Sequence, residues 1–226
     1  MRLAVLASGR GSNLLAILAA IGRGEIDARV AGVFSDKPDA PALEHARQAG
    51  LHAQALSPRG FASRVDFDEH LFSMVDAVHP DLIVCAGYMR LISDPVVAAH
   101  TGRMINIHPS LLPEFKGLRT HQQALDAHAT VHGASVHYVT AELDGGPVIA
   151  QARVPVEADD DAARLAERVL QREHPLLVAT LRELATGRIA WIDQRVHFDG
   201  HPLPAPLLLD DANQLVRNRT LQESNA

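Results

Sequence analysis

The sequence predicts an α/β fold in which helices flank a mostly parallel central sheet. Short apolar runs alternate with amphipathic stretches through the first half of the chain. The apolar runs show no polar alternation, which is typical of parallel strands buried on both faces. The chain has 226 residues, of which 47% are hydrophobic and 21% charged, as in an ordinary globular protein. At this length the chain can form one large domain or two small ones.

The first half provides the parallel part of the predicted sheet. Its apolar runs predict strands at Leu3–Ala7, Ala28–Phe34, Leu82–Ala86 and Met104–Ile107, with a short strand at Gln54–Leu56. Helical spacing with polar faces predicts helices at Asn13–Ile21, Ala40–Ala49 and Val65–Val78. The order of these elements is that of repeated βαβ units.

The second half predicts an antiparallel portion and one long helix. Strands are expected at Ala134–Val139 and Val148–Val156, with a turn between them at Leu143–Pro147. Acidic residues 159–161 suit the positive end of a helix dipole, and the helix is expected to continue to about Ala185 and to end at Gly187. A final hairpin is expected at Ile189–Ile192 and Arg195–Phe198. We therefore expect one domain over residues 1–209 and a flexible polar tail over residues 210–226.

Composition excludes several classes of function. With 21 basic and 27 acidic residues the net charge is −6, which weighs against a nucleic-acid or anionic-membrane surface. The single cysteine, Cys85, excludes a disulfide framework within the chain, and its apolar surroundings predict a core position instead of a nucleophile. The apolar run after Met1 is too short for a signal peptide, and no run approaches the roughly 20 residues of a membrane span. We expect a cytoplasmic protein.

The loop at residues 8–13 follows the first strand and leads into a helix. Glycines there let backbone N–H groups approach an anion at the helix N-terminus. The loop lacks the ending of a Walker A motif and matches the dinucleotide fingerprint only in part, because Leu14 stands at the third glycine position. Asp36 stands where a ribose-binding acid would lie, so a nucleotide-dependent oxidoreductase is an alternative. A tight turn capped by Ser12 or Asn13 is another.

Asn106 and His108 are the strongest candidates for catalysis. Residues i and i+2 of a strand point to the same face, and this pair ends an apolar run, where open α/β sheets place their ligand crevices. An amide donor and a group that titrates near neutrality could stabilise an oxyanion and move a proton. A structural asparagine with a capping histidine is the alternative. Asp144 is a possible partner that would favour the charged imidazole, although its segment alone resembles an ordinary hairpin turn.

Taken together, these motifs resemble those of the phosphoribosylglycinamide formyltransferase family, from Leu3 to about Gly187. The resemblance rests on several motifs in order: Gly9–Leu14, Phe34–Asp36, Ala86–Leu91, Asn106–Pro113, His132–His137 and Leu143–Pro147. It implies a Rossmann-like formyltransferase fold, with a phosphate-binding half over about residues 1–100 and a folate-binding and catalytic half over about residues 101–209. The segment Glu114–Arg119 departs from the family pattern, which commonly has proline and histidine near its end.

The resemblance implies transfer of a formyl group from 10-formyltetrahydrofolate, as co-substrate, to the amine of 5'-phosphoribosylglycinamide. Residues implied to bind the ribonucleotide are Gly11, Ser12, Asn13 and Glu173. Those implied to bind the folate are Arg64, Met89, Arg90, Leu91, Ile92, Asn106, Thr140, Ala141, Glu142, Leu143 and Asp144. The implied catalytic residues are Asn106, His108 and Asp144, supported by Ser135 and His137. Small-molecule substrates are implied, with no nucleic acid or membrane partner, no metal, and a monomer or homodimer.

Four alternatives have different consequences in the sequence. A methionyl-tRNA formyltransferase would be longer and more basic, and a formyltetrahydrofolate hydrolase usually carries an additional N-terminal regulatory module. Leu14 disfavours the oxidoreductase, and a non-catalytic binding module would not need asparagine, histidine and aspartate together.

The 13 histidines first suggest a metal site, but no paired ligand spacing supports one. His121 and His132 are left without an assigned role.

Overall fold

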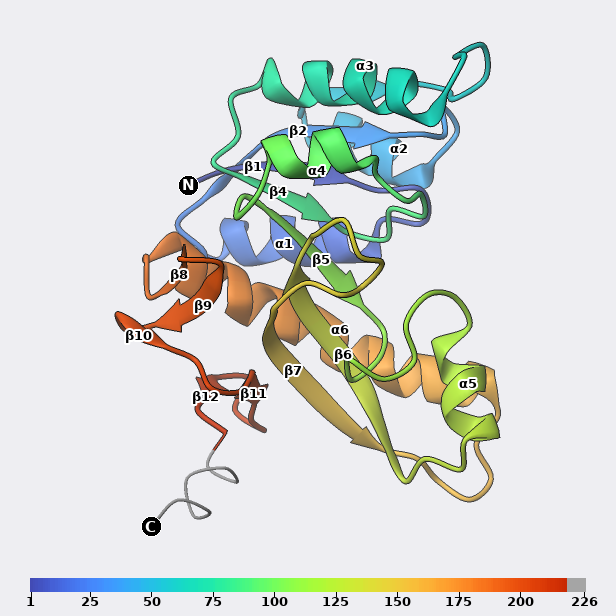
Figure 1. Ribbon diagram of the computed structural model, residues 1–226, viewed down its shortest axis with the longest axis vertical. Helices are drawn as coiled ribbons and strands as arrows, with labels where there is room; N and C mark the ends of the chain where they lie inside the picture. Colours follow the sequence, from blue (N-terminus) through green and yellow to red (C-terminus); the bar gives the residue numbers. More distant parts are fainter. Residues whose placement is uncertain (219–226) are drawn as a thin grey trace. The chain divides into compact units, whose positions relative to one another are not determined.

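The computed structural model describes residues 1–218 (Figure 1). The chain divides into two compact units. The first contains Met1–Asn106 and Tyr138–Gly146, and the second contains Ile107–His137 and the chain from Pro147 onward. Among the described residues, no helix has both the length and the apolar character that a membrane crossing requires.

The first unit is an α/β layer structure built on parallel strands. Its strands are β1 (Arg2–Leu6), β2 (Arg29–Ser35), β3 (Ala53–Ala55), β4 (Leu82–Cys85) and β5 (Met104–His108). They lie in the order β5-β4-β1-β2-β3, and each neighbouring pair is parallel. Strand β5 continues into the second unit with its last two residues. The helices are α1 (Ser12–Gly22), α2 (Pro41–Gln48), α3 (Arg64–Asp76) and α4 (Asp94–Ala99).

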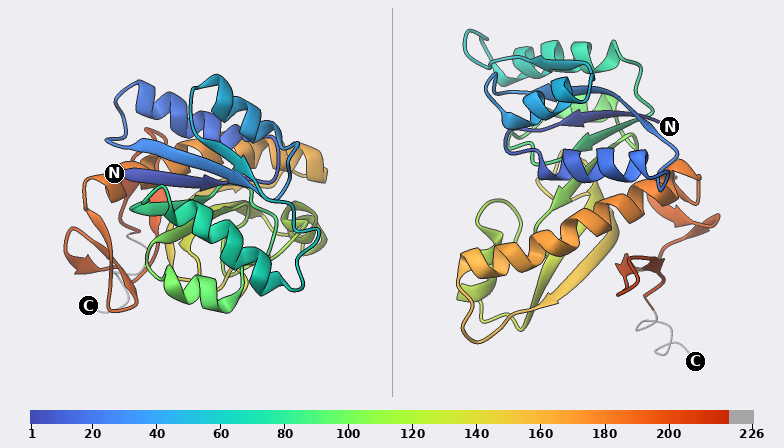
Figure 2. Two further views of the ribbon diagram at one scale, coloured as in Figure 1. Left: turned by 90° about the horizontal axis from the view of Figure 1, so that it is seen from above. Right: turned by 180° about the vertical axis from the view of Figure 1, so that it is seen from behind.

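Helices cover both faces of these strands (Figure 2). Helices α3 and α4 contribute Phe67, Phe72 and Val97 to one buried cluster, which includes Leu6 of β1 and Ile83 of β4. Helices α1 and α2 lie on the opposite face. Because both faces are covered, β1 and β4 contain no polar side chain between Leu3 and Leu6 or between Leu82 and Cys85.

The second unit combines an antiparallel pair with a long helix. Its strands β6 (Val131–Tyr138) and β7 (Val148–Pro155) are antiparallel; β11 (Leu207–Leu209) pairs parallel with β7, and β12 (Leu215–Val216) pairs antiparallel with β11. The helices are α5 (Thr120–Asp126) and α6 (Ala162–Ala185). The side chain of Asp161 caps α6 by accepting a hydrogen bond from the Arg164 amide. A separate antiparallel sheet contains β8 (Ile189–Ile192), β9 (Arg195–Phe198) and β10 (His201–Pro202).

Each strand and helix predicted from the sequence is present, within a few residues of its expected bounds. The mostly parallel sheet, the C-terminal antiparallel portion and the long helix are confirmed. The short elements α4, α5, β10, β11 and β12 were not predicted from the sequence.

Regular structure continues beyond residue 210, into the predicted tail, as far as β12. Arg172 of α6 donates to the carbonyl oxygens of Leu209 and Asp210, and Arg182 donates to Gln214. Side chains far away in sequence therefore hold a segment that has no apolar face of its own. Residues 219–226 of the predicted tail lie outside the described part of the chain.

Gly133 gives a stability test of the β6–β7 pair. A Cβ added there would lie 1.9 Å from the Ala152 carbonyl oxygen, whereas a Cβ at Gly22 would meet no atom within 4 Å. We expect Gly133→Ala to lower the free energy of unfolding by roughly 1–3 kcal/mol, the usual effect of overpacking, and Gly22→Ala to lower it by far less. Urea denaturation measures both, and equal stabilities of the two variants would contradict the register in which β6 pairs with β7.

Candidate functional site

The loop after β1 presents the free N-terminus of α1. Gly11 is the residue before the helix and has a φ of 78°, in the left-handed region that glycine tolerates best. A Cβ on Gly11 would lie 2.8 Å from Cα and Cβ of Ala42, so any larger residue would push the loop away from α2. No side chain caps the helix, so the alternative of a turn capped by Ser12 or Asn13 is wrong. The first amides of α1 are therefore available to an anion, as helix N-termini generally allow.

Asp36 has a partner within the first unit. It is buried, and the Ser8 hydroxyl donates a hydrogen bond to its Oδ1 at 2.5 Å. Leu14, at the third position of the dinucleotide fingerprint, is completely buried in the core. A close approach of backbone to a pyrophosphate needs glycine there, so the structure disfavours the oxidoreductase.

Asn106 and His108 lie two residues apart at the end of β5 and share one face of it. Asn106 is half-buried and His108 is buried. The carbonyl oxygen of Phe115 can only accept, so His108 Nε2 donates the hydrogen bond between them, at 3.1 Å. This bond fixes the direction of the imidazole ring and puts a proton on Nε2.

Ser135 holds the turn that follows His108. Its hydroxyl donates to the Ser110 carbonyl oxygen at 2.7 Å and accepts from the Leu112 amide at 3.0 Å. Gln151 of β7 donates to both the Ser135 hydroxyl and the Leu112 carbonyl oxygen. The His137 ring stands edge-on to that of His108, with centroids 6.5 Å apart. Both predicted supporting residues thus lie in the second unit with His108.

His121 and His132 form a pair that the sequence could not connect. His121 Nδ1 lies 3.2 Å from His132 Nε2, and the His132 ring also contacts Phe115 edge-on. Burial, followed by the charges of His121 and His108, lowers the pKa of His132 to about 4. Burial, followed by the charge of His108, also lowers the pKa of His121. They are separated by a helix and a turn, so no spacing in the sequence indicates the contact. Within residues 1–218, no group of three or more His, Cys, Asp or Glu side chains could hold a metal ion.

The segment containing Asp144 belongs to the first unit. It starts beside β5, where the Val139 amide donates to the Met104 carbonyl oxygen at 2.9 Å. Asp144 has a φ of 47°, which aspartate adopts more readily than most residues. A Cβ on Gly146 would lie 1.9 Å from the Tyr138 carbonyl oxygen, so the segment closes tightly on itself. It also contains the predicted folate-binding residues Thr140, Ala141, Glu142 and Leu143.

The remaining predicted folate-binding residues in the first unit belong to two segments. Arg64 is the exposed first residue of α3. Met89 and Leu91, which follow β4, expose 63% and 44% of their surface, so this segment offers apolar contact area to a ligand. Arg90 lies over the Phe67 ring at 4.9 Å, and Ile92 is buried.

Two buried groups have strongly shifted acidities. Burial raises the pKa of the Cys85 thiol to about 12, which excludes it as a nucleophile near neutral pH. Glu173, the predicted ribonucleotide contact on α6, has an exposed fraction of 8%, and burial raises its pKa to about 7.

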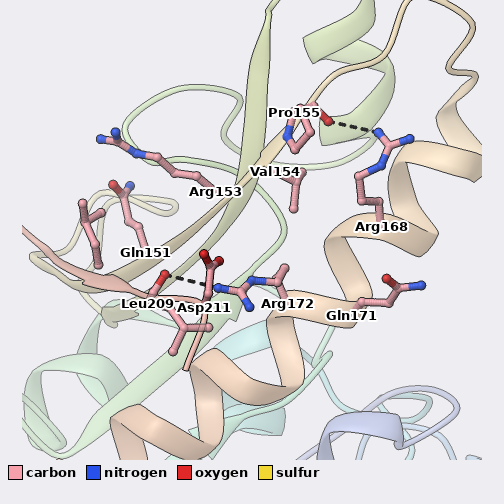
Figure 3. A pocket seen from close by; sticks show the side chains of 10 residues that line it. Gln151, Arg153, Val154, Pro155, Arg168, Gln171, Arg172, Leu209 and Asp211 are labelled. Carbon is pink, nitrogen blue, oxygen red and sulfur yellow. Dashed lines mark hydrogen bonds between the residues drawn. The ribbon is translucent and has the colours of Figure 1, made fainter. Parts of the chain in front are cut away.

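A cavity of about 440 Å³ in the second unit contains none of the predicted site residues (Figure 3). Arg153, Arg168 and Arg172 line it, but Arg168 is paired with Asp160 at 2.6 Å. Arg172 donates to backbone carbonyl oxygens of the C-terminal segment, as the figure shows for Leu209. Arg168 and Arg172 therefore serve the packing of α6.

Comparison with known proteins identifies the relatives of this chain. The family model described as formyl transferase matches residues 1–181. The chain is 46% identical over 204 residues to the phosphoribosylglycinamide formyltransferase of Escherichia coli strain K12, covering 90% of this chain and 96% of that protein. The structure of the Coxiella burnetii phosphoribosylglycinamide formyltransferase is similar, with a TM-score of 0.86, 43% identity, and coverage of 90% of this chain and 95% of that one. The glycinamide ribonucleotide transformylase 1 of Symbiobacterium toebii gives a TM-score of 0.84 at 44% identity, covering 88% and 93%.

The raised pKa of Glu173 predicts a pH-dependent stability. From its ordinary value of 4.5 up to about 7 the folded state binds more protons than the unfolded state, so stability falls as pH rises through this window. Above it, the buried carboxylate costs on the order of 3 kcal/mol. We expect Glu173→Gln to match the wild type near pH 4 and to be more stable at pH 8. Urea denaturation at several pH values tests this, with Glu167→Gln on the exposed face of α6 as control; parallel wild-type and Glu173→Gln curves would contradict it.

Proposed function

The chain belongs to the family of phosphoribosylglycinamide formyltransferases, and we propose that it transfers a formyl group from 10-formyltetrahydrofolate to the amine of 5'-phosphoribosylglycinamide. The observation that carries this proposal is the match over 96% of the E. coli enzyme at 46% identity. The paired asparagine and histidine at the end of a buried strand provide the chemistry that such a transfer needs.

We propose that the loop after β1 binds the phosphate of the ribonucleotide. Gly11 keeps the N-terminus of α1 open, and Ser12 and Asn13 provide its first amides. The Oδ1 atom of Asn13 is buried and has no hydrogen-bond partner among residues 1–218, so it can accept a hydrogen bond from a donor group of the substrate other than the phosphate. Glu173 would contact the ribose hydroxyl groups, for which a carboxyl group is a suitable acceptor.

For the folate, we propose contacts from Arg64, the Met89–Ile92 segment and the 140–144 segment. The exposed Met89 and Leu91 side chains suit an aromatic ring system, and the Arg64 guanidinium suits the carboxylates of the folate tail. Backbone groups of the 140–144 segment can supply hydrogen bonds, since its tight closure holds them in fixed directions.

The proposed reaction is direct attack of the substrate amine on the formyl carbon. The Asn106 amide and protonated His108 would stabilise the oxyanion of the tetrahedral intermediate, and Asp144 would support the imidazolium. The proton of the incoming nitrogen would move to the departing folate nitrogen. Ser135 and His137 support this role by fixing the turn and the space around His108.

We propose that the enzyme acts on small-molecule substrates in the cytoplasm, without nucleic acid or a metal ion, as a monomer or homodimer. The net charge of −6 and the buried single thiol support this setting.

A two-substrate assay tests the function directly. Purified protein should convert 10-formyltetrahydrofolate to tetrahydrofolate only when phosphoribosylglycinamide is present. The conversion is measured by the change in folate absorbance. Absence of ribonucleotide-dependent conversion would refute the transferase. Steady conversion without ribonucleotide would indicate a formyltetrahydrofolate hydrolase instead.

Single substitutions test the catalytic roles. We expect His108→Ala and Asp144→Ala each to lower kcat by at least about 10²-fold, the usual contribution of a positioned acid–base or oxyanion-stabilising group. His79→Ala, at an exposed histidine outside the proposed site, should retain the wild-type rate. Near-normal turnover of either His108→Ala or Asp144→Ala would remove that residue from the mechanism.

A further inference from the structure

The segment from Ala86 to Ser93, between β4 and α4, contains no helix or strand. It includes Met89–Ile92, which we propose binds the folate. A segment without its own ladder of backbone hydrogen bonds depends on outside partners for its shape. Among its partners in the first unit are two hydrogen-bonded anchors, and each of these involves a buried carboxylate.

The first anchor is the Ser8 hydroxyl. It accepts a hydrogen bond from the Met89 amide at 2.9 Å and donates its only proton to Asp36 Oδ1 at 2.5 Å. The Ser8 amide also donates to the Gly87 carbonyl oxygen at 3.0 Å. Because the Ser8 hydroxyl hydrogen points to Asp36, a lone pair of the Ser8 oxygen is directed at the Met89 amide. Ser8 directly precedes the loop proposed to bind the ribonucleotide phosphate.

The second anchor is Asp68 of α3. Its side chain is completely buried, and its Oδ2 accepts a hydrogen bond from the Ser93 amide at 2.7 Å. A bond between a backbone amide and a buried carboxylate is short and stronger than a neutral one. The neighbouring Phe67 carries the Arg90 guanidinium over its ring, so α3 contacts the segment twice.

Tyr88 directly precedes Met89 in the segment, and its phenol interacts electrostatically with both carboxylates. Burial, followed by the charges of Asp36 and Asp68, raises the pKa of its phenol, whereas Arg90 lowers it. The charges of both carboxylates therefore act on the same segment. Its backbone is fixed on the buried side, while Met89 and Leu91 are exposed on the other side.

We propose that Asp68, and Asp36 acting through Ser8, are positioning residues that hold Met89–Ile92 in the conformation that receives the folate. This proposal rests on the proposed function of the segment. It assigns to Asp36 a role in shaping the folate site, and it makes the Ser8 hydroxyl a physical link between the two substrate-binding segments.

The proposed role of Asp68 is tested by measuring KM separately for the folate and for the ribonucleotide. We expect Asp68→Ala to raise KM for 10-formyltetrahydrofolate about tenfold, as the loss of one hydrogen bond to a charged group implies, with KM for the ribonucleotide and kcat within about twofold of wild type. Asp68→Asn, which keeps an acceptor oxygen, should recover most of the affinity. Glu69→Ala, the exposed neighbour on α3, should change neither constant. Equal changes in both Michaelis constants, or none, would overturn the proposal.

Amide hydrogen exchange of the free protein tests the anchor without any substrate. In Asp68→Ala, which removes the acceptor, the Ser93 amide should exchange faster than in the wild type, while amides of β1 and β4 should be unchanged and Asp68→Asn should stay close to the wild type. Unchanged exchange at Ser93 would overturn the anchor even in an active enzyme. Faster exchange in a protein that lacks formyl transfer would instead retain the anchor and refute the proposed function.

A double-mutant cycle tests the link through Ser8. Ser8→Ala should raise KM for the folate, Asp36→Asn should raise it less, and the double variant should resemble Ser8→Ala, because Asp36 acts only by orienting the hydroxyl. Multiplicative effects of the two substitutions would show that Asp36 acts by another route and would overturn that part of the proposal.

Discussion

Strands β1 and β4 of the first unit are buried on both faces, so polar side chains can be placed only where the strands end. Ser8 follows β1, Asp36 follows β2, and Gly87 follows β4. In the structure these three are linked by hydrogen bonds through Ser8. The apolar sheet thus forces the polar groups to one edge, and the hydrogen bonds there decide the shapes of the loops that we propose bind the substrates.

In β5, too, polar side chains occur only where the buried strand ends. Its Met104 and Ile105 are buried, and polar side chains begin at Asn106. His108 is held by the Phe115 carbonyl oxygen, and the turn after it is held by Ser135. The imidazole that we propose stabilises the oxyanion therefore lies at the end of a strand, while the turn after it is fixed by Ser135 of β6.

Much of the fold could be predicted because its elements are defined by local patterns. The buried strands, the capped α6 and the glycine after it each have a physical signature within a few residues. The short helices α4 and α5 have too few turns to show a clear period. The segment after residue 210 is ordered by Arg172 and Arg182 of α6, which no local pattern reveals.

The sequence by itself determined the fold class and the shared face of Asn106 and His108. Both depend on periodicity, which is a property of neighbouring residues. The sequence left open whether a side chain caps the N-terminus of α1, and the structure decided that none does. Only the tertiary structure decided the partners of buried polar groups: Asp36 with Ser8, Asp68 with the Ser93 amide, and His121 with His132. Such groups must be satisfied once they leave water, but which partner satisfies them depends on how distant segments pack.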